Sequence, residues 1–161
     1  MNTPYKILAI DSNHECLNTG LRDAGFIVDE DYTSSKEIIE EKIAEYDGMI
    51  VRSRFPIDKA FLTKANNLKF IGRVGAGLEN IDENFAAQQN ITLFNSPEGN
   101  RDSVGEHAIG MLLMLMHHLR RADNEVRNGI WKREENRGDE LKGKTVGIIG
   151  YGNMGNAFAK R

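Results

Sequence analysis

Short apolar runs alternate with amphipathic stretches from the start of the chain. Residues 6–10 form a compact apolar run typical of a buried strand, and residues 14–24 have the spacing of a helix that ends at Gly25. Residues 26–28 predict a second strand. One strand followed by one helix is the repeating pattern of parallel α/β units.

The same alternation continues through the next seventy residues. Ser34 and Glu37 have the spacing of a capping box, ahead of a helix whose apolar positions 38, 39, 43 and 44 we expect on one face. Further strands are predicted at residues 49–51, 68–73 and 91–94, and further helices at 58–64 and 83–89. Five strands with helices between them predict an α/β fold, a flavodoxin-like doubly wound parallel sheet.

The pattern changes after the turn at residues 95–99. Residues 102 to about 128 predict one long helix, so we expect a domain of residues 1–99 and the start of a second domain at 100–161. Within this predicted helix, residues 108–116 are apolar on nearly all sides. Such a stretch is either buried within its own domain or forms a subunit interface, and the pattern leaves both open.

A glycine-rich loop follows a predicted strand near the C-terminus. Gly129 ends the long helix, residues 131–139 form a charged loop, and residues 141–149 predict a strand before a short helix that includes 156–160. Gly150, Gly152 and Gly155 spell G-x-G-x-x-G between them, which in this position indicates dinucleotide binding.

Each glycine of this motif has a physical task. Gly150 permits the tight turn, Gly152 lets the backbone approach a pyrophosphate, and Gly155 lets the helix pack closely. The N–H groups near Asn153 and Met154 then face the phosphates. An acidic ribose ligand about 20 residues further on does not fit before Arg161.

Composition narrows the function classes. The chain has 161 residues and a net charge of −3, so no general basic field favours nucleic acid or an anionic membrane. Its apolar runs are far shorter than the roughly 20 residues of a membrane span. We expect a cytoplasmic protein, and we expect its single cysteine, Cys16, to be a small core residue.

The four histidines do not form a recognisable catalytic or metal site. His107 beside Glu106, and His117 beside His118, are consecutive helix residues and point about 100° apart. Helical metal ligands need spacings of three or four residues. We therefore expect His14 and these three histidines to be structural or exposed, and we expect no metal site.

Five blocks of sequence carry a further signal. They are VRS at 51–53, GRVGAGLENID at 72–82, NSPEGN at 95–100 with SVGE at 103–106, GIW at 129–131, and LKGKTVGIIGYGNMG at 141–155. In this order they resemble the D-isomer-specific 2-hydroxyacid dehydrogenases, and most closely the phosphoglycerate branch of that family.

The resemblance implies an NAD-dependent enzyme that interconverts a 2-hydroxy acid and its 2-oxo acid, here in serine biosynthesis. It implies a substrate domain followed by a Rossmann domain, and a protein at least roughly twice this length. Independently of the resemblance, the apolar, Met-rich stretch leads us to expect a homodimer formed through the 102–128 helix region. The catalytic Arg, Glu and His of the family lie later, so no residue here is assigned a catalytic role and the 161 residues alone should be inactive.

When the substrate-binding positions of the family are transferred to this sequence, they fall at the ends of two predicted strands. Arg52 with Ser53 follows the third strand, and Arg73 with Gly75, Ala76 and Gly77 follows the fourth. Ligands of open α/β sheets bind at such ends. The N–H groups of the glycines can bind a carboxylate, and the guanidinium groups of the arginines can bind a carboxylate or a phosphate. The alternative for both arginines is an ion pair at the edge of the sheet.

Four further positions follow from the resemblance. Arg133 matches a position that helps to hold substrate in some relatives, but a solvated surface charge explains it equally well. Ala76 also borders the cofactor, where some relatives carry Thr. Asn153 and Met154 replace the commoner Arg-Ile, which removes a positive charge but leaves the backbone donors.

Two non-enzymatic functions remain open. A short module could bind an anionic metabolite through Arg52, Arg73 and the 75–77 loop without catalysis. An interaction protein resembling the family's corepressors could use the Met-rich helix as a docking surface.

Overall fold

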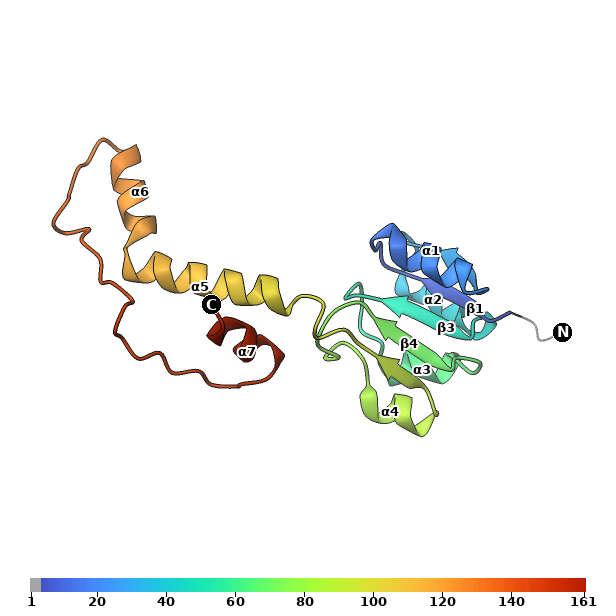
Figure 1. Ribbon diagram of the computed structural model, residues 1–161. Helices are drawn as coiled ribbons and strands as arrows, with labels where there is room; N and C mark the ends of the chain where they lie inside the picture. The colour runs from blue at the N-terminus through green and yellow to red at the C-terminus, as the bar shows by residue number, and fades with distance from the viewer. Residues whose placement is uncertain (1–3) are drawn as a thin grey trace. The chain divides into compact units, whose positions relative to one another are not determined.

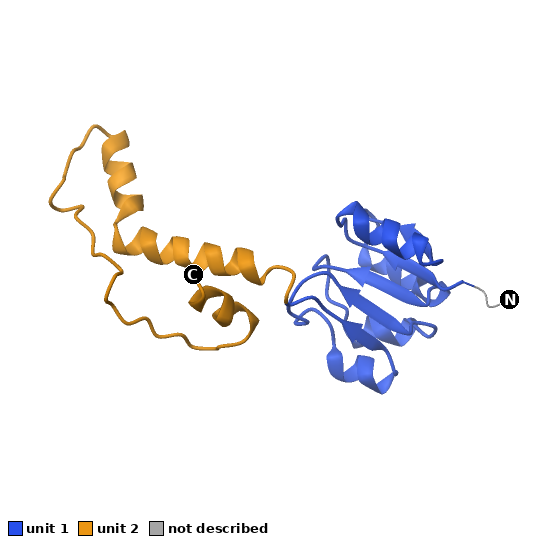
Figure 2. Cartoon of the chain, viewed as in Figure 1, with its two compact units in different colours: residues 1–97 blue, residues 98–161 orange. Residues whose placement is uncertain are grey.

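The computed structural model describes residues 4–161, and the chain forms two compact units, Met1–Pro97 and Glu98–Arg161 (Figure 2). The first unit is a five-stranded parallel sheet with helices on its faces (Figure 1). Its strands are β1 Lys6–Ala9, β2 Ile27–Glu30, β3 Gly48–Val51, β4 Phe70–Arg73 and β5 Thr92–Phe94. Their spatial order is β2-β1-β3-β4-β5, so the predicted flavodoxin-like sheet is confirmed.

Helices connect the strands as predicted. They are α1 Glu15–Asp23, α2 Lys36–Lys42 with the 3-10 turn η1 Ile43–Glu45, α3 Lys59–Lys64 and α4 Glu83–Gln88. Aspartates begin two of them, because the Asp58 carboxylate accepts the Phe61 N–H at 3.0 Å and the Asp82 carboxylate accepts the Phe85 N–H at 2.9 Å.

The sheet has an apolar layer on each face. In β1, Leu8 contributes to one cluster and Ile7 to the other, because successive strand side chains point to opposite faces. The larger cluster includes side chains of α2, α3 and α4, among them Ile39, Phe61, Leu62 and Ala86. The smaller cluster lies under Leu17 and Leu21 of α1.

The start of α2 differs from the prediction. The N-cap is Ser35, not Ser34, and its side chain makes no capping hydrogen bond. Ser34 is held outside the helix, since its N–H donates to the Asp31 carboxylate at 2.9 Å and its carbonyl accepts from Arg54. Ile38 is 50% exposed and does not share the buried face of Ile39.

Cys16 is exposed, so its predicted place in the core is wrong. The neighbouring Leu17 packs against the sheet instead. Consecutive helix residues point about 100° apart, and only one of these two side chains can face the sheet.

The second unit contains α5 Arg101–Met116, α6 Leu119–Arg127 and α7 Asn153–Ala159. The predicted single long helix is therefore wrong, because the chain breaks at His118, whose φ is 53°. The Met116 carbonyl accepts the N–H of Asp139 at 3.0 Å, and a Cβ at Gly138 would lie 2.5 Å from the His117 Cα. The loop that contains Gly138 and Asp139 thus packs against the C-terminal end of α5, and the helix does not continue past that point.

The strand predicted at residues 141–149 is also absent, and no strand occurs anywhere in residues 98–161. A strand needs a hydrogen-bonded neighbour, and this segment has none in the unit. α5 and α7 do pack together: Gly105 is buried, and a Cβ there would lie 3.0 Å from the Ala157 carbonyl carbon. Within residues 4–161, no helix is long and apolar enough to cross a bilayer.

Candidate functional site

The strand register brings the two predicted substrate blocks to one edge of the sheet. Val51, the last residue of β3, pairs with Arg73, the last residue of β4. The N–H of Val74 then donates to the Val51 carbonyl at 2.8 Å. Arg52 and the loop after Arg73 therefore leave adjacent strands at the carboxyl edge, where ligands of such sheets bind.

The loop of residues 75–77 is anchored through its carbonyls. The Gly75 carbonyl accepts the Ser96 N–H at 2.8 Å, and the Ala76 carbonyl accepts Nδ2 of Asn95 at 2.6 Å. None of the three N–H groups of Gly75, Ala76 and Gly77 donates a hydrogen bond within residues 4–161. A fixed loop with free donors can bind a carboxylate without rearranging.

Arg73 supplies the charge beside this loop. Its side chain is partly buried, and its Nε is buried with no hydrogen-bond partner within the described residues. Gly75 has φ +149°, and a Cβ there would overlap Nη1 of Arg73. The guanidinium therefore lies directly over the glycine backbone, and an unpartnered buried donor is costly unless a ligand satisfies it.

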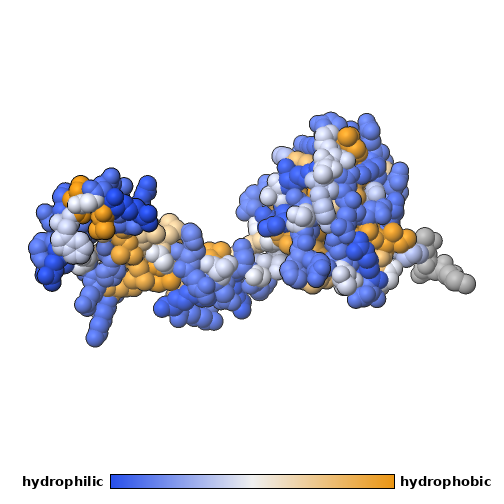
Figure 3. Space-filling view, turned by 90° about the horizontal axis from the view of Figure 1, so that it is seen from above, coloured by the Kyte–Doolittle hydropathy of each residue, from blue (hydrophilic) through white to orange (hydrophobic). Residues whose placement is uncertain are grey.

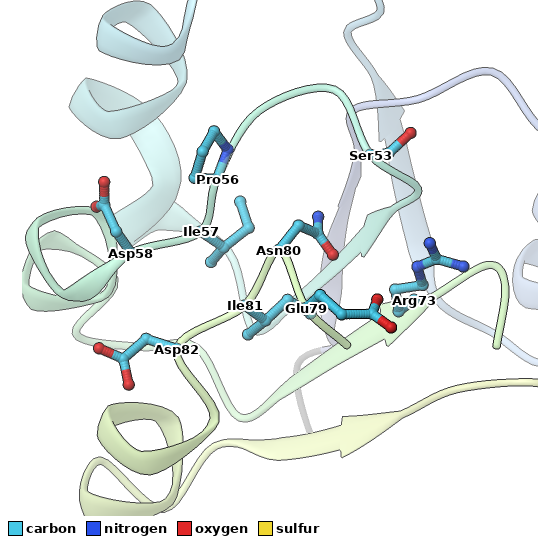
Figure 4. Close-up of a pocket in the computed structure, with 9 residues that line it drawn as sticks. All are labelled: Ser53, Pro56, Ile57, Asp58, Arg73, Glu79, Asn80, Ile81 and Asp82. Carbon is cyan, nitrogen blue, oxygen red and sulfur yellow. The ribbon is translucent and has the colours of Figure 1, made fainter. Parts of the chain in front are cut away.

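A hollow of about 570 Å³ adjoins Arg73, and Figure 4 shows its lining. Ser53 and Arg73 line it near the strand ends, whereas Asp58 and Asp82 lie at the starts of α3 and α4. Its remaining lining residues are Pro56, Ile57, Glu79, Asn80 and Ile81. Figure 4 places the Glu79 carboxylate beside Arg73, so the strand-end side of the hollow carries both a guanidinium and a carboxylate, and the side at the helix starts carries the Asp58 and Asp82 carboxylates.

Sequence reasoning missed the acidic and amide residues of this hollow. Glu79 and Asn80 directly follow the glycine loop, and a Cβ at Gly77 would overlap the Glu79 carboxylate. The letters ENID at 79–82 were the available signal. The Lys36 ammonium and the Phe61 N–H hold the pKa of Asp58 below its usual value, so this carboxylate is anionic near neutral pH.

Arg52 and Ser53 are both exposed. Neither Arg52 nor Arg73 forms an ion pair within residues 4–161, so the predicted alternative of a sheet-edge ion pair has no partner there. Both guanidinium groups are free to bind an anion.

Arg133 belongs to the second unit. Its side chain is 78% exposed, and Nε lies 3.9 Å from the Glu134 carboxylate. The loop around it is fixed, because Arg121 donates to Asn136 at 2.8 Å and Asn136 donates to Glu125 at 2.6 Å. Its role in substrate binding stays a prediction.

The glycine motif has the geometry that its three glycines require. Gly150 has φ +85°, a conformation that favours glycine. A Cβ at Gly155 would overlap the Gly150 carbonyl, whereas a Cβ at Gly152 would meet nothing within 4 Å. The backbone thus turns tightly at Gly150, is closely packed at Gly155 and has open space beside Gly152. Gly152 is the N-cap of α7, and Asn153 and Met154 form its first turn.

The histidines have local structural roles where contacts are present. Nδ1 of His14 accepts the Cys16 N–H at 3.3 Å and caps α1, and His118 forms the break between α5 and α6. Across residues 4–161, no group of three His, Cys, Asp or Glu side chains is placed to hold a metal ion.

A parallel sheet with ligand loops at its strand ends, followed by a glycine turn, is an arrangement found in dehydrogenases. Residues 7–159 match the family described as D-isomer specific 2-hydroxyacid dehydrogenase, catalytic domain, and the chain belongs to that family.

Individual relatives agree with this assignment. The chain is 38% identical over 156 residues to D-3-phosphoglycerate dehydrogenase of Archaeoglobus fulgidus, covering 97% of this chain and 30% of that protein. It is 35% identical to the human D-3-phosphoglycerate dehydrogenase, again covering 97% of this chain but 29% of the relative. The chain therefore spans about a third of the length of these curated relatives.

A solved structure is similar over almost the whole chain. The NAD+-bound 3-phosphoglycerate dehydrogenase of Entamoeba histolytica has a TM-score of 0.75 and 33% identity, covering 98% of this chain and 50% of that one.

Proposed function

We propose that the chain is the N-terminal portion of an NAD-dependent D-2-hydroxyacid dehydrogenase that acts on 3-phosphoglycerate, in serine biosynthesis. The observation that carries the proposal is the 75–77 loop, whose three free N–H groups adjoin the unpartnered Nε of Arg73. The names of the relatives support the substrate and the cofactor. Residues 1–99 would then be the substrate domain and 100–161 the start of the NAD-binding domain.

The geometry suggests how a phosphorylated hydroxy acid would be held. The N–H groups of Gly75 and Gly77 would bind the carboxylate, and Arg73 would neutralise it. Arg52 and Ser53, on the adjacent strand end, would take the phosphate, with Arg133 as a further proposed contact. A rigid donor set of this kind binds an anion with little loss of entropy.

NAD supplies the hydride acceptor when it is bound. The residues that would hold its pyrophosphate are Gly150, Gly152 and Gly155 with the N–H groups of Asn153 and Met154, and Ala76 would border it. The open space over Gly152 and the tight packing of Gly155 fit this use. Because none of these residues is assigned to proton transfer, we expect the 161-residue chain to bind substrate but not to oxidise it.

The first experiment separates binding from turnover. We expect calorimetric titration of the purified chain with 3-phosphoglycerate to show binding, and R73M to lose it. R73K should recover only part of the affinity, because lysine keeps the charge but lacks the planar fork. Absence of binding by the unaltered chain would overturn the proposed substrate site.

The second experiment tests inactivity. The chain incubated with 3-phosphoglycerate and NAD should produce no NADH. Steady NADH formation would show that residues 1–161 already contain a proton-transfer group. Tight binding without NAD, together with a reading frame that ends at Arg161, would instead favour the metabolite-binding module.

We also propose that α5 and α6 form a homodimer interface. Met111 is 52% exposed, Met114 44% and Leu115 72%, and they line a hollow of about 650 Å³ with His118, Arg120, Arg121 and Asn124. Figure 3 shows hydrophobic residues gathered along this part of the second unit. Exposed apolar faces of this kind are often buried at interfaces, and a second copy related by a twofold axis would bury this face against itself.

A further inference from the structure

The backbone of Arg52 is held on both sides while its side chain is free. Its N–H donates to Oδ2 of Asp11 at 2.5 Å, and its carbonyl accepts Nδ2 of Asn80 at 3.3 Å. The side chain is exposed and forms no ion pair or hydrogen bond within residues 4–161. The hydrogen bonds therefore fix the point at which the Arg52 side chain leaves the sheet, while the side chain itself can still rotate.

Arg54, two residues later, is turned into the fold. Its Nη1 donates to the carbonyls of Ile10 at 2.8 Å and Asp31 at 2.7 Å, and its Nη2 donates to the Ser34 carbonyl. These three carbonyls follow β1 and β2, on the far side of the turn from Arg73. One guanidinium thus ties the turn after β3 to the ends of two other strands.

The groups that hold Arg54 are themselves fixed. The N–H of Ile10 donates to the Ile50 carbonyl at 3.0 Å, which extends the pairing of β1 with β3. The Asp31 carboxylate accepts the Ser34 N–H at 2.9 Å and the Lys42 ammonium. The turn of residues 52–54 therefore cannot shift without breaking contacts to rigid parts of the sheet.

We infer that Asp11 and Arg54 are positioning residues, which hold the backbone of Arg52 where its side chain can reach the anionic ligand, without touching the ligand themselves. The inference rests on the proposed function, because it assumes that Arg52 binds the ligand. Its physical basis is preorganisation: because the backbone of the turn is already fixed, binding does not have to order it, and the only ordering cost that remains is that of the Arg52 side chain itself. Arg54 makes this contribution through main-chain carbonyls, and Asp11 through one main-chain N–H.

The test is a double-mutant cycle in the complete 161-residue chain, with 3-phosphoglycerate as the probe in calorimetric titration. R54M and D11A should each raise Kd by about tenfold, equivalent to about 1.4 kcal/mol. In an R52A background, the same changes should raise Kd by less than about twofold, because the residue that they position is gone.

R22M is the matched control. Arg22 also donates to a main-chain carbonyl, that of Val28 at 3.3 Å, and also forms a side-chain contact, with Glu30 at 2.5 Å, but it lies in α1. It should lower the melting temperature without changing Kd. If R54M does not fold, R54K and D11A carry the same cycle, since a lysine can reach fewer of the three carbonyls.

The outcomes separate the two proposals. If the unaltered chain does not bind 3-phosphoglycerate, the proposed function fails and the positioning role fails with it. If the unaltered chain binds, but R54M and D11A bind equally well or lose as much affinity in the R52A background, the positioning role alone is wrong. Loss of affinity that depends on Arg52 supports it.

Discussion

The guanidinium of Arg73 lies over the backbone of Gly75, so that a side chain at position 75 would occupy the space of its Nη1 atom. The glycine therefore does two things: it adopts φ +149°, and it leaves room for the arginine beside the free N–H groups. The charge and the backbone donors of the proposed carboxylate site depend on each other.

G75A should consequently weaken binding of 3-phosphoglycerate by about tenfold or more. The methyl group displaces the Arg73 guanidinium, and the backbone strain should lower the free energy of unfolding by about 1–3 kcal/mol. Calorimetry and urea unfolding measure the two effects.

The control for this change is G20A, in the interior of α1. A Cβ at Gly20 meets nothing within 4 Å, and alanine favours the helix, so stability should stay equal or rise with no change in Kd. A G75A protein that binds as tightly as the unaltered chain would contradict the proposed geometry.

The glycine turn allows a paired test within one motif. G155A should loosen α7, because its methyl group would overlap the Gly150 carbonyl, with a local cost of about 1–3 kcal/mol. G152A should leave α7 intact, since the space over it is open. The rates of hydrogen exchange of the α7 amides in the two variants measure this difference.

The same two substitutions, G152A and G155A, should have a different effect on the binding of NAD. We expect the chain to bind NAD only weakly, through phosphate contacts, and G152A to weaken that binding although α7 stays folded. Equal exchange protection of α7 in G155A and G152A would show that the packing at position 155 is unimportant.

Acid should destabilise the first unit through Asp31. The Lys42 ammonium and the N–H groups of Ser34 and Thr33 hold the pKa of Asp31 well below its ordinary value in the folded protein. A depressed folded pKa contributes stability above the unfolded value, about 3.9, and that contribution is lost as the pH falls toward the folded value.

D31N should therefore be less stable than the unaltered chain at pH 7, and the difference should shrink below about pH 4. Urea unfolding at several pH values measures it. D23N is the control, since Asp23 is an exposed residue of α1 with no side-chain hydrogen bond or ion pair in the described part of the chain. A difference that stays constant into strong acid would exclude Asp31 as its source.

The proposed dimer interface can be tested with one substitution that introduces a charge. L115E should shift the chain from dimer to monomer in sedimentation experiments, because a carboxylate would be buried at the interface without a partner. I38E places the same charge on an exposed isoleucine of α2 and should leave the assembly unchanged. A monomeric unaltered chain at high concentration would contradict the interface.

The sheet could be predicted from sequence because its signals are local. β1 and β3 are buried apolar runs, and capping aspartates such as Asp58 precede short helices. The strand-end position of Arg52 and Arg73 followed directly from that alternation. The contacts of Arg54 could not be predicted, since they join residues 20 to 44 positions apart.

The second unit was predicted less well because its structure depends on distant contacts. Helix propensity continues through His117 and His118, and the break comes from the packing of Gly138 and Asp139 against the end of α5. Residues 141–149 have the composition of a strand, but composition does not provide the neighbour with which a strand must pair.

That unpaired segment has a consequence for handling the chain in solution. Residues 145–149, TVGII, carry no charge and no proline, and Ile149 is fully exposed. The backbone N–H and C=O groups of such a run can pair with those of a second molecule to form a strand pair, which is the first step of β-aggregation. Self-association through this segment would be open-ended and slow to reverse, whereas a dimer through α5 and α6 would be closed and saturable.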